Sequence, residues 1–430
     1  MNISIVGSGY VGLVTAVGLA SKGHSVVCID VDQDRVNLIN QAEAPFYETG
    51  LAEALRTHVR EKANLRASSD YSDLLDSDLT FVCVNTSRNS GENADFSHVR
   101  QSARNIGETL GRKDGYHVVV TKSSVVPGTT EDVIIPLLEK CSGKKVGRDF
   151  GVAVNPEFLQ EGRALHSFLN SDRIIVGEYD RRSGNSVEEV YNGCHSPVIR
   201  TGIRTAEMIK FASNAFLATR ISFINEIGNL CKKLGIDVYE VADGMGHDPR
   251  IGRSFLNAGI GFGGSCLPKD LEALLDKCKK MGEKSAMLGA VYETNKAQPL
   301  RVIDVARQRL GELRGRKLAV LGLAFKPDTD DIRNAPAVEI MHQLLQQGAR
   351  LKVYDPKALP NIRESFSDSI EYGSSVRDAI DGCDCVLILT EWEEFKDESL
   401  YSGKVVVDGR RALDPEKAKR VCQSYEGVCW

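Results

Sequence analysis

The sequence predicts an α/β protein in which two doubly wound domains are joined by a long central helix. Short apolar runs alternate with helical patterns over the first two hundred residues, and the same rhythm returns near the C-terminus. Parallel sheets with helices on both faces produce such alternation, because their strands are buried on both sides. The chain of 430 residues also exceeds what one hydrophobic core usually supports, so two or three domains are expected.

Apolar runs predict the strands of the two sheets. In the N-terminal part they cover residues 3–6, 25–29, 79–84, 117–121 and 151–154. Near the C-terminus they cover residues 317–321, 351–354, 385–389 and 404–407. Gly7 and Gly322 follow the first strand of each set, and Asp30 and Asp355 follow the second. We therefore expect the same type of fold to occur twice.

A long helix is predicted between the two sets of strands. Apolar residues recur at helical spacing from 204 to 235, and only Gly228 interrupts the run before its end. Such a helix would be about 45 Å long. Its apolar stripe also favours pairing with a second copy, so we expect a homodimer or a dimer-based oligomer. The predicted domains are 1–199, 200–298 and 299–430.

Composition excludes several classes of protein. A net charge of -5 without a basic stripe argues against nucleic-acid binding. There is no run of about 18 apolar residues and no signal peptide, so no membrane association is expected and a cytoplasmic location is predicted. The eleven cysteines follow no repeating spacing, which favours reduced thiols. No zinc-site spacing is found, and no metal is predicted.

The N-terminal segment carries a dinucleotide fingerprint. Gly7, Gly9 and Gly12 follow the first strand and open a helix, and Asp30 closes the next strand 18 residues after Gly12. In a Rossmann-like domain these glycines permit the turn and a close approach to a pyrophosphate, while the carboxylate binds ribose hydroxyls. That carboxylate would repel the 2'-phosphate of NADP. NAD is therefore favoured, although Arg35 could pair with such a phosphate.

A second glycine-rich segment surrounds Cys266. Four glycines precede this thiol in the run Gly259-Ile-Gly-Phe-Gly-Gly-Ser-Cys-Leu-Pro-Lys-Asp270. Glycines let the backbone approach a ligand closely, and a thiol there can carry an acyl group. On the predicted helix, Lys210 and Asn214 lie four apart and share one face. They could be catalytic or simply exposed to solvent.

Taken in order, these motifs resemble the UDP-glucose/GDP-mannose dehydrogenase family over essentially the whole chain. The most specific blocks cover residues 248–270, 322–333 and 408–411, and the segment Asn155-Pro-Glu-Phe-Leu-Gln-Glu-Gly162 supports them. The resemblance implies an NAD-dependent, four-electron oxidation of a nucleotide-linked sugar at C6. A cysteine thiohemiacetal and a thioester would be the intermediates, and two NADH would form. UDP-glucose is favoured as the substrate, with GDP-mannose as the alternative.

The resemblance also implies roles for individual residues. Catalysis is expected from Cys266, Lys210, Asn214, Asp270, Glu157 and Ser124. The cofactor is expected to contact Gly7, Gly9, Tyr10, Val11, Gly12, Asp30, Arg35, Thr86, Ser124, Glu161 and Arg333. The nucleotide-sugar is expected to contact Glu157, Phe158, Leu159, Lys210, Asn214, Arg250, Phe255, Gly263, Phe325, Lys326 and Arg410. Of these, Arg250 is expected to reach the site of a partner subunit.

Two other kinds of protein remain open at this stage. A two-electron hydroxyacid-type dehydrogenase has a similar scaffold but needs no cysteine, and a sensor of nucleotide-sugars needs no turnover. The number of NADH formed per sugar separates the first from a four-electron enzyme. Measurable turnover excludes the second.

Overall fold

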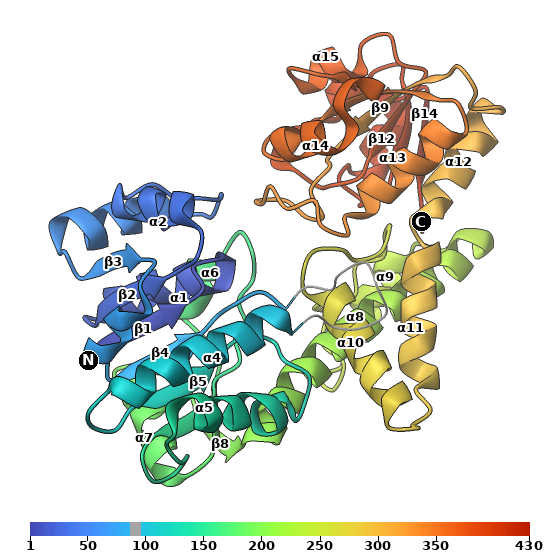
Figure 1. The fold of residues 1–430 in the computed structure, drawn as a ribbon. Coiled ribbons are helices and arrows are strands. Elements are labelled where there is room, and N and C mark those ends of the chain that lie inside the picture. The colour runs from blue at the N-terminus through green and yellow to red at the C-terminus, as the bar shows by residue number, and fades with distance from the viewer. Residues whose placement is uncertain (87–95) are drawn as a thin grey trace. The chain divides into compact units, whose positions relative to one another are not determined.

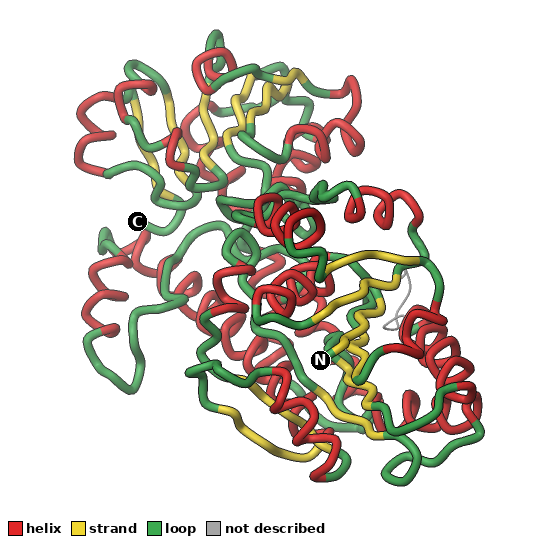
Figure 2. Tube along the Cα trace, turned by 90° about the vertical axis from the view of Figure 1, so that its left-hand side faces the viewer, coloured by secondary structure: helices red, strands yellow, loops and turns green. Residues whose placement is uncertain are grey.

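The computed structural model describes residues 1–86 and 96–430, which divide into two compact units, Met1–Ser213 and Asn214–Trp430 (Figure 1). Each unit contains a sheet whose strands, yellow in Figure 2, are accompanied by helices. The α/β fold class with two doubly wound sheets is thereby confirmed.

The sheet of the first unit has the strand order β3-β2-β1-β4-β5-β6-β7-β8 among the described residues. Its strands are β1 Asn2–Val6, β2 Ser25–Ile29, β3 Leu65–Ser68, β4 Leu79–Val82, β5 Val118–Thr121, β6 Gly151–Val154, β7 Ile174–Glu178 and β8 Val198–Gly202. Neighbouring strands are parallel, except that β6 and β7 are antiparallel. The order from β3 to β6 is that of dinucleotide-binding folds, which bind ligands where the strand order reverses, here between β1 and β4.

Both faces of this sheet are buried, which explains its nearly continuous apolar strands. Alternate residues of β1 face opposite ways: Ile3 and Ile5 pack with α1, whereas Val6 packs with α4 and α5. The helices and turns are α1 Tyr10–Ser21, α2 Gln33–Asn40, α3 Leu51–Leu55, η1 Arg56–Glu61, η2 Tyr71–Asp76, α4 Ser97–Arg112, η3 Thr130–Ile134, α5 Ile135–Ser142, α6 Ala164–Leu169 and α7 Arg181–Val190.

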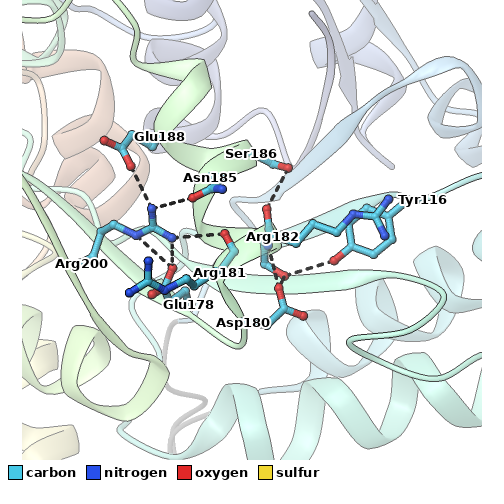
Figure 3. A network of polar contacts seen from close by, with 10 residues as sticks. Tyr116, Glu178, Asp180, Arg181, Arg182, Asn185, Ser186, Glu188 and Arg200 are labelled. Carbon is cyan, nitrogen blue, oxygen red and sulfur yellow. Dashed lines mark hydrogen bonds and ion pairs between the residues drawn. The ribbon is translucent and has the colours of Figure 1, made fainter.

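Polar contacts fix the edge strand β8, whose residues are at most partly buried. The guanidinium of Arg200 donates to Glu178, to Asn185 at 2.6 Å and to Glu188 at 3.1 Å (Figure 3). The Asp180 side chain caps α7 by accepting from Ser183 N at 2.7 Å. Ion pairs therefore anchor an edge that apolar burial alone does not fix.

The second unit repeats the topology of the first. Its sheet has the order β11-β10-β9-β12-β13-β14 within the described residues, and its neighbouring strands are parallel. The strands are β9 Lys317–Leu321, β10 Arg350–Tyr354, β11 Glu371–Tyr372, β12 Cys385–Ile388, β13 Val405–Asp408 and β14 Ser424–Gly427. The strand order reverses between β9 and β12, so a second ligand crevice is expected at their carboxyl ends.

The predicted long helix is confirmed as α8 Ile203–Leu234. The helices that follow are α9 Val238–Gly246, α10 Leu267–Lys280, α11 Ala286–Ala297, α12 Leu300–Leu310, α13 Pro336–Gln346, α14 Leu359–Phe366, α15 Val376–Ile380 and α16 Pro415–Val421, with short turns η4 Ser367–Ser369, η5 Glu393–Phe395 and η6 Glu398–Tyr401. Across residues 1–86 and 96–430, no helix combines the length and the apolar character needed to cross a membrane.

Candidate active site

The glycine fingerprint forms a tight turn between β1 and α1. Gly7 has a φ of +91°, and a Cβ there would lie 2.9 Å from Cys83 O. A Cβ on Gly12 would lie 1.8 Å from Gly7 O, so only glycine fits. By contrast, a Cβ on Gly9 would meet nothing within 4 Å. The backbone at Gly9 therefore faces open space at the N-terminus of α1, as an approaching pyrophosphate requires.

Asp30 stands at the end of β2 beside this turn. One of its oxygens accepts from Ser8 N at 2.6 Å and from Ser8 Oγ at 2.7 Å, and the other accepts from Asp32 N at 3.0 Å. Burial alone would raise the pKa of Asp30, but these hydrogen bonds and Arg35, at 3.3 Å, hold it below its usual value. The carboxylate is thus anionic. Together with the open face at Gly9, it fits the ribose and pyrophosphate of NAD.

Gly9→Ala is expected to weaken NAD binding without unfolding the protein. The backbone at Gly9 has a φ of -65°, which alanine tolerates, and the added methyl group contacts no protein atom. The methyl group would instead occupy the space next to the backbone that the pyrophosphate needs. Titration with NAD should show a Kd raised at least about tenfold, with the melting temperature unchanged. An unchanged Kd would contradict this placement of the cofactor.

Tyr10 takes part in a buried link between α1 and the loop after β6. Its hydroxyl donates to the carboxylate of Glu48, which is buried. Glu48 also accepts from Gly162 N at 2.8 Å and from Ala164 N at 2.7 Å. Val11 follows Tyr10 on α1. Glu48 was not anticipated from the sequence, because it lies outside every motif and its partners are 38, 114 and 116 residues away.

Other residues predicted to contact the cofactor follow β4, β5 and β6. Thr86 is buried just after β4, and Glu161 is partly buried in the loop after β6. Ser123 Oγ donates to Val84 O at 2.7 Å, whereas Ser124 is only partly buried. Arg333 belongs to the second unit, where its guanidinium pairs with Asp331 at 2.7 Å. Contacts of these residues with NAD stay predictions.

Lys210 and Glu157 form a buried ion pair in the first unit. Lys210 Nζ lies 2.8 Å from Glu157 Oε1, and their side chains are 5% and 6% exposed. The other oxygen of Glu157 accepts from Leu159 N at 2.6 Å. Burial would raise the pKa of Glu157, but Lys210 and the Leu159 N–H lower it below its usual value. A cation and a carboxylate are thus held together. The Phe158 ring lies nearby, with its centre 5.5 Å from Lys210 Nζ.

A second buried lysine, Lys122, supports the loop after β6. Lys122 Nζ donates to Asn155 Oδ1 at 2.9 Å, and Tyr191 OH donates to the same oxygen at 2.6 Å. Burial lowers the pKa of Lys122 to about 8. Asn155 opens a segment that supports the family resemblance, but its contact with Lys122 joins residues 33 apart and could not be predicted from the sequence.

Asn214 and Asp270 form a buried polar pair in the second unit. Asn214 Nδ2 donates to Asp270 Oδ2 at 2.6 Å, and the two residues are 7% and 1% exposed. Lys269 Nζ lies 3.0 Å from Asp270 Oδ1 as an ion pair. Lys210 and Asn214, four positions apart on α8, therefore each contact a buried carboxyl group, and their catalytic role stays a prediction.

Cys266 is the N-cap residue of α10, directly after the glycine-rich segment. Its carbonyl accepts from Asp270 N at 3.0 Å, which begins the helix. A helix N-terminus favours a thiolate, and the Cys266 side chain is only partly buried. In contrast, burial raises the pKa of Cys83, Cys385 and Cys429 to about 12. Cys266 therefore has the setting of a nucleophile that these buried thiols lack.

Residues predicted to bind the nucleotide gather around the glycine-rich segment. Phe325 and Lys326 follow β9, and Arg410 follows β13. The Arg410 guanidinium donates to Gly261 O at 2.9 Å, while a Cβ on Gly264 would lie 2.8 Å from the Phe325 ring. The residues that follow β9 and β13 thus contact the glycine-rich segment that leads to Cys266.

Two residues predicted to bind the substrate, Arg250 and Phe255, are exposed. The Arg250 side chain is 87% exposed and pairs with Asp248 at 2.6 Å. Phe255 is 41% exposed, with a φ of +61°.

Comparison with known proteins identifies the family. Models of the UDP-glucose/GDP-mannose dehydrogenase family match its NAD binding domain at residues 1–195, its central domain at 204–297 and its UDP binding domain at 319–415. The chain belongs to the UDP-glucose/GDP-mannose dehydrogenase family. Its membership confirms the predicted oxidoreductase class and NAD as the cofactor.

Full-length members of the family are similar to this chain. UDP-glucose 6-dehydrogenase AglM of Haloferax volcanii is 44% identical over 96% of this chain and 97% of its own length. GDP-mannose 6-dehydrogenase of Pseudomonas aeruginosa is 36% identical over the full length of both. The structure of a UDP-glucose dehydrogenase from Pyrobaculum islandicum matches with a TM-score of 0.95 and 41% identity, covering 100% of this chain and 98% of that one.

Proposed function

We propose that this family member oxidises UDP-glucose at C6 to UDP-glucuronate and forms two NADH per sugar. The observation that carries the proposal is the half-buried Cys266 thiol at the start of α10, behind four glycines. The higher identity to a UDP-glucose enzyme than to a GDP-mannose enzyme, 44% against 36%, supports UDP-glucose. GDP-mannose is the alternative substrate.

In the first oxidation, the polar groups of α8 act on the C6 hydroxyl. NAD held at the glycine fingerprint would be the hydride acceptor in both oxidations. The hydroxyl proton passes to a base, directly or through water, while Lys210 and Asn214 stabilise the developing oxyanion. Glu157, 2.8 Å from Lys210, holds the ammonium in place.

In the second oxidation, Cys266 keeps C6 of the sugar covalently bound to the enzyme. Its sulfur bonds to C6 of the aldehyde, and the aldehyde oxygen takes up a proton, which gives a thiohemiacetal. Loss of the C6 hydride and the hydroxyl proton leaves a thioester. Water then attacks the thioester carbon, releasing the carboxylate and the thiol. Asp270 and Glu157 are the carboxylates proposed to activate this water, and Ser124 to position reacting groups.

The second unit is proposed to hold the UDP moiety. Phe325 offers an aromatic face, and Lys326 and Arg410 offer cations for the pyrophosphate. The predicted contacts of Phe158, Leu159 and Gly263 with the sugar belong to the same proposal. We retain the division into a cofactor domain 1–199, a central domain 200–298 and a UDP-sugar domain 299–430. The free cysteines support a cytoplasmic location, where thiols stay reduced.

A homodimer formed through α8 is part of the proposal. Phe216, Phe223 and Leu230 recur every seven residues on this helix and are 59%, 46% and 55% exposed. A stripe of that kind favours packing against a second copy. The exposed Arg250 is proposed to enter the partner's substrate site.

Arg250→Ala is therefore expected to lower activity although, within its own chain, the exposed side chain pairs with Asp248. The KM for UDP-glucose should rise about tenfold or more, because one cation is lost, with the KM for NAD unchanged. Mixing this variant with Cys266→Ser protein should restore some activity, since one shared site would then be intact. No recovery in mixed dimers would contradict a contribution across the interface.

The function is tested with a substrate panel and a count of NADH. Purified protein is given UDP-glucose, UDP-N-acetyl sugars and GDP-mannose, and each product is identified by mass. Two NADH per UDP-glucose and a uronate product are expected. A value near one supports a two-electron dehydrogenase instead, and no turnover with any sugar supports a sensor.

A further inference from the structure

The segment before Cys266 needs an external support. Residues 259–264 lie outside every helix and strand and include four glycines. Glycine has the greatest backbone freedom of any residue, so such a segment is poorly ordered by itself. Because Cys266 follows directly, freedom in the segment would displace its thiol. A nucleophile misplaced by about 1 Å can lose about a hundredfold in rate.

One side chain supports the middle of the segment. Asn295, on α11, accepts from Phe262 N at 2.8 Å and donates from Nδ2 to Phe262 O at 3.0 Å. A single amide thus satisfies both backbone groups of one residue, as a neighbouring strand would.

Two buried amides support the start of the segment in the same way. Gly259 N donates to Asn225 Oδ1 at 2.8 Å, and Gln298 Nε2 donates to Gly259 O at 2.8 Å. Asn225 is 0% exposed and Gln298 is 1% exposed. We call Asn225, Asn295 and Gln298 the amide clamp. Its members come from α8, from α11 and from just after α11.

The shape of the segment shows why amides are used there. Gly261 has a φ of +94°, and a Cβ on Gly263 would lie 2.3 Å from Asn334 O. Neither position accepts a side chain, so burial can act only at Ile260 and Phe262, which are 0% and 7% exposed. Gly264 N donates to Arg333 O at 2.9 Å, which fixes the last residue before the Ser265-Cys266 pair. At the glycines, which have no side chain to bury, backbone hydrogen bonds hold the path.

We propose that Asn295, with Asn225 and Gln298, is a positioning residue that holds the glycine-rich segment so that Cys266 captures the aldehyde formed in the first oxidation. The inference rests on the proposed function, because it concerns the step in which the sulfur bonds to C6. Loosening the segment slows that bond more than it slows the first hydride transfer. Aldehyde then leaves the enzyme after one NADH has formed.

Release of aldehyde after one NADH distinguishes a displaced thiol from a folding defect. Fewer folded molecules would lower the rate of both oxidations equally, and each sugar would still give two NADH. A displaced thiol changes the ratio itself.

The test is Asn295→Leu, which removes both hydrogen bonds and keeps a side chain of similar size. NADH formed per UDP-glucose consumed is counted, and free aldehyde is trapped with hydroxylamine and identified by mass. We expect kcat to fall about 10- to 100-fold, fewer than two NADH per sugar and trapped aldehyde, with the KM for NAD unchanged. Asn295→Asp keeps the acceptor for Phe262 N but not the donor, so a smaller loss of the same kind is expected.

Asn40→Leu is a matched control. Asn40 also bonds both backbone groups of one residue, since its Nδ2 donates to Ala67 O at 2.9 Å and its Oδ1 accepts from Ala67 N at 2.8 Å. That residue lies on β3, and two NADH per sugar are expected. Two NADH per sugar without aldehyde in both Asn295 variants would overturn the clamp proposal. One NADH per sugar in the wild type would instead overturn the proposed function.

Discussion

Cys266→Ser is expected to abolish acid formation almost completely. A serine hydroxyl ionises far less readily than a thiol, and its adduct with the aldehyde forms and breaks less readily than a thiohemiacetal. Loss of a covalent nucleophile can cost on the order of a thousandfold or more in kcat. The first oxidation does not use the sulfur, so one NADH per sugar should still be able to form.

Rapid mixing with UDP-glucose and NAD checks this result. The Cys266→Ser protein should give at most one NADH per sugar in the first turnover and a slow steady state thereafter. Cys278→Ser is the control, because Cys278 is a partly buried cysteine on the same helix, α10, and has no proposed role. Uronate formed at the wild-type rate by Cys266→Ser would rule out the thioester route.

Sequence patterns predicted the parts of the fold that depend on local chemistry. The turn at Gly7 was predicted because its glycines are close in sequence, and the helix α8 because apolar residues recur at helical spacing. Strand β8 was not predicted, since its residues are at most partly buried and Arg200 secures it through distant acidic side chains. Strand β3 was also missed, because its sequence, LRAS, mixes exposed and buried positions.

The candidate site was predictable to a similar extent. Cys266 stood out because glycines surround it, and Lys210 and Asn214 because they share a helix face. Their carboxylate partners, 53 and 56 residues away, were named only through the family resemblance. Asn295 and Glu48 gave no signal, since their roles arise from contacts that only the folded chain creates. The ion pair between Lys269 and Asp270 is likewise a contact that only the structure shows.

Lys210→Met is expected to reduce both stability and activity. The change leaves the Glu157 carboxylate buried without the cation that lies 2.8 Å from it. Breaking a buried ion pair from one side typically costs about 3–5 kcal/mol. For a unit of this size, the melting temperature should fall on the order of 10 °C. Loss of the oxyanion donor should also raise the barrier by about 3 kcal/mol, a fall in kcat of roughly a hundredfold.

The loss of stability should depend on pH in a defined direction. In the wild type, the pKa of Glu157 lies below its ordinary value of 4.5, so its contribution to stability is present above that pH and is lost as the pH falls. Without Lys210, burial dominates and the folded pKa rises above the unfolded one. The carboxyl group then stabilises the fold below about pH 4.5, and this contribution is lost as the pH rises through the raised pKa.

The difference in melting temperature between wild type and Lys210→Met should therefore widen from about pH 5 to about pH 8. Adding Glu157→Gln should recover much of the melting temperature, because no buried charge remains, while kcat stays low. Lys145→Met is the matched control, since Lys145 pairs with Glu139 at 3.1 Å but is 64% exposed, and it should change little. If the difference is the same at both pH values, Lys210 does not keep Glu157 ionised, and the electrostatic basis assigned to this pair is wrong.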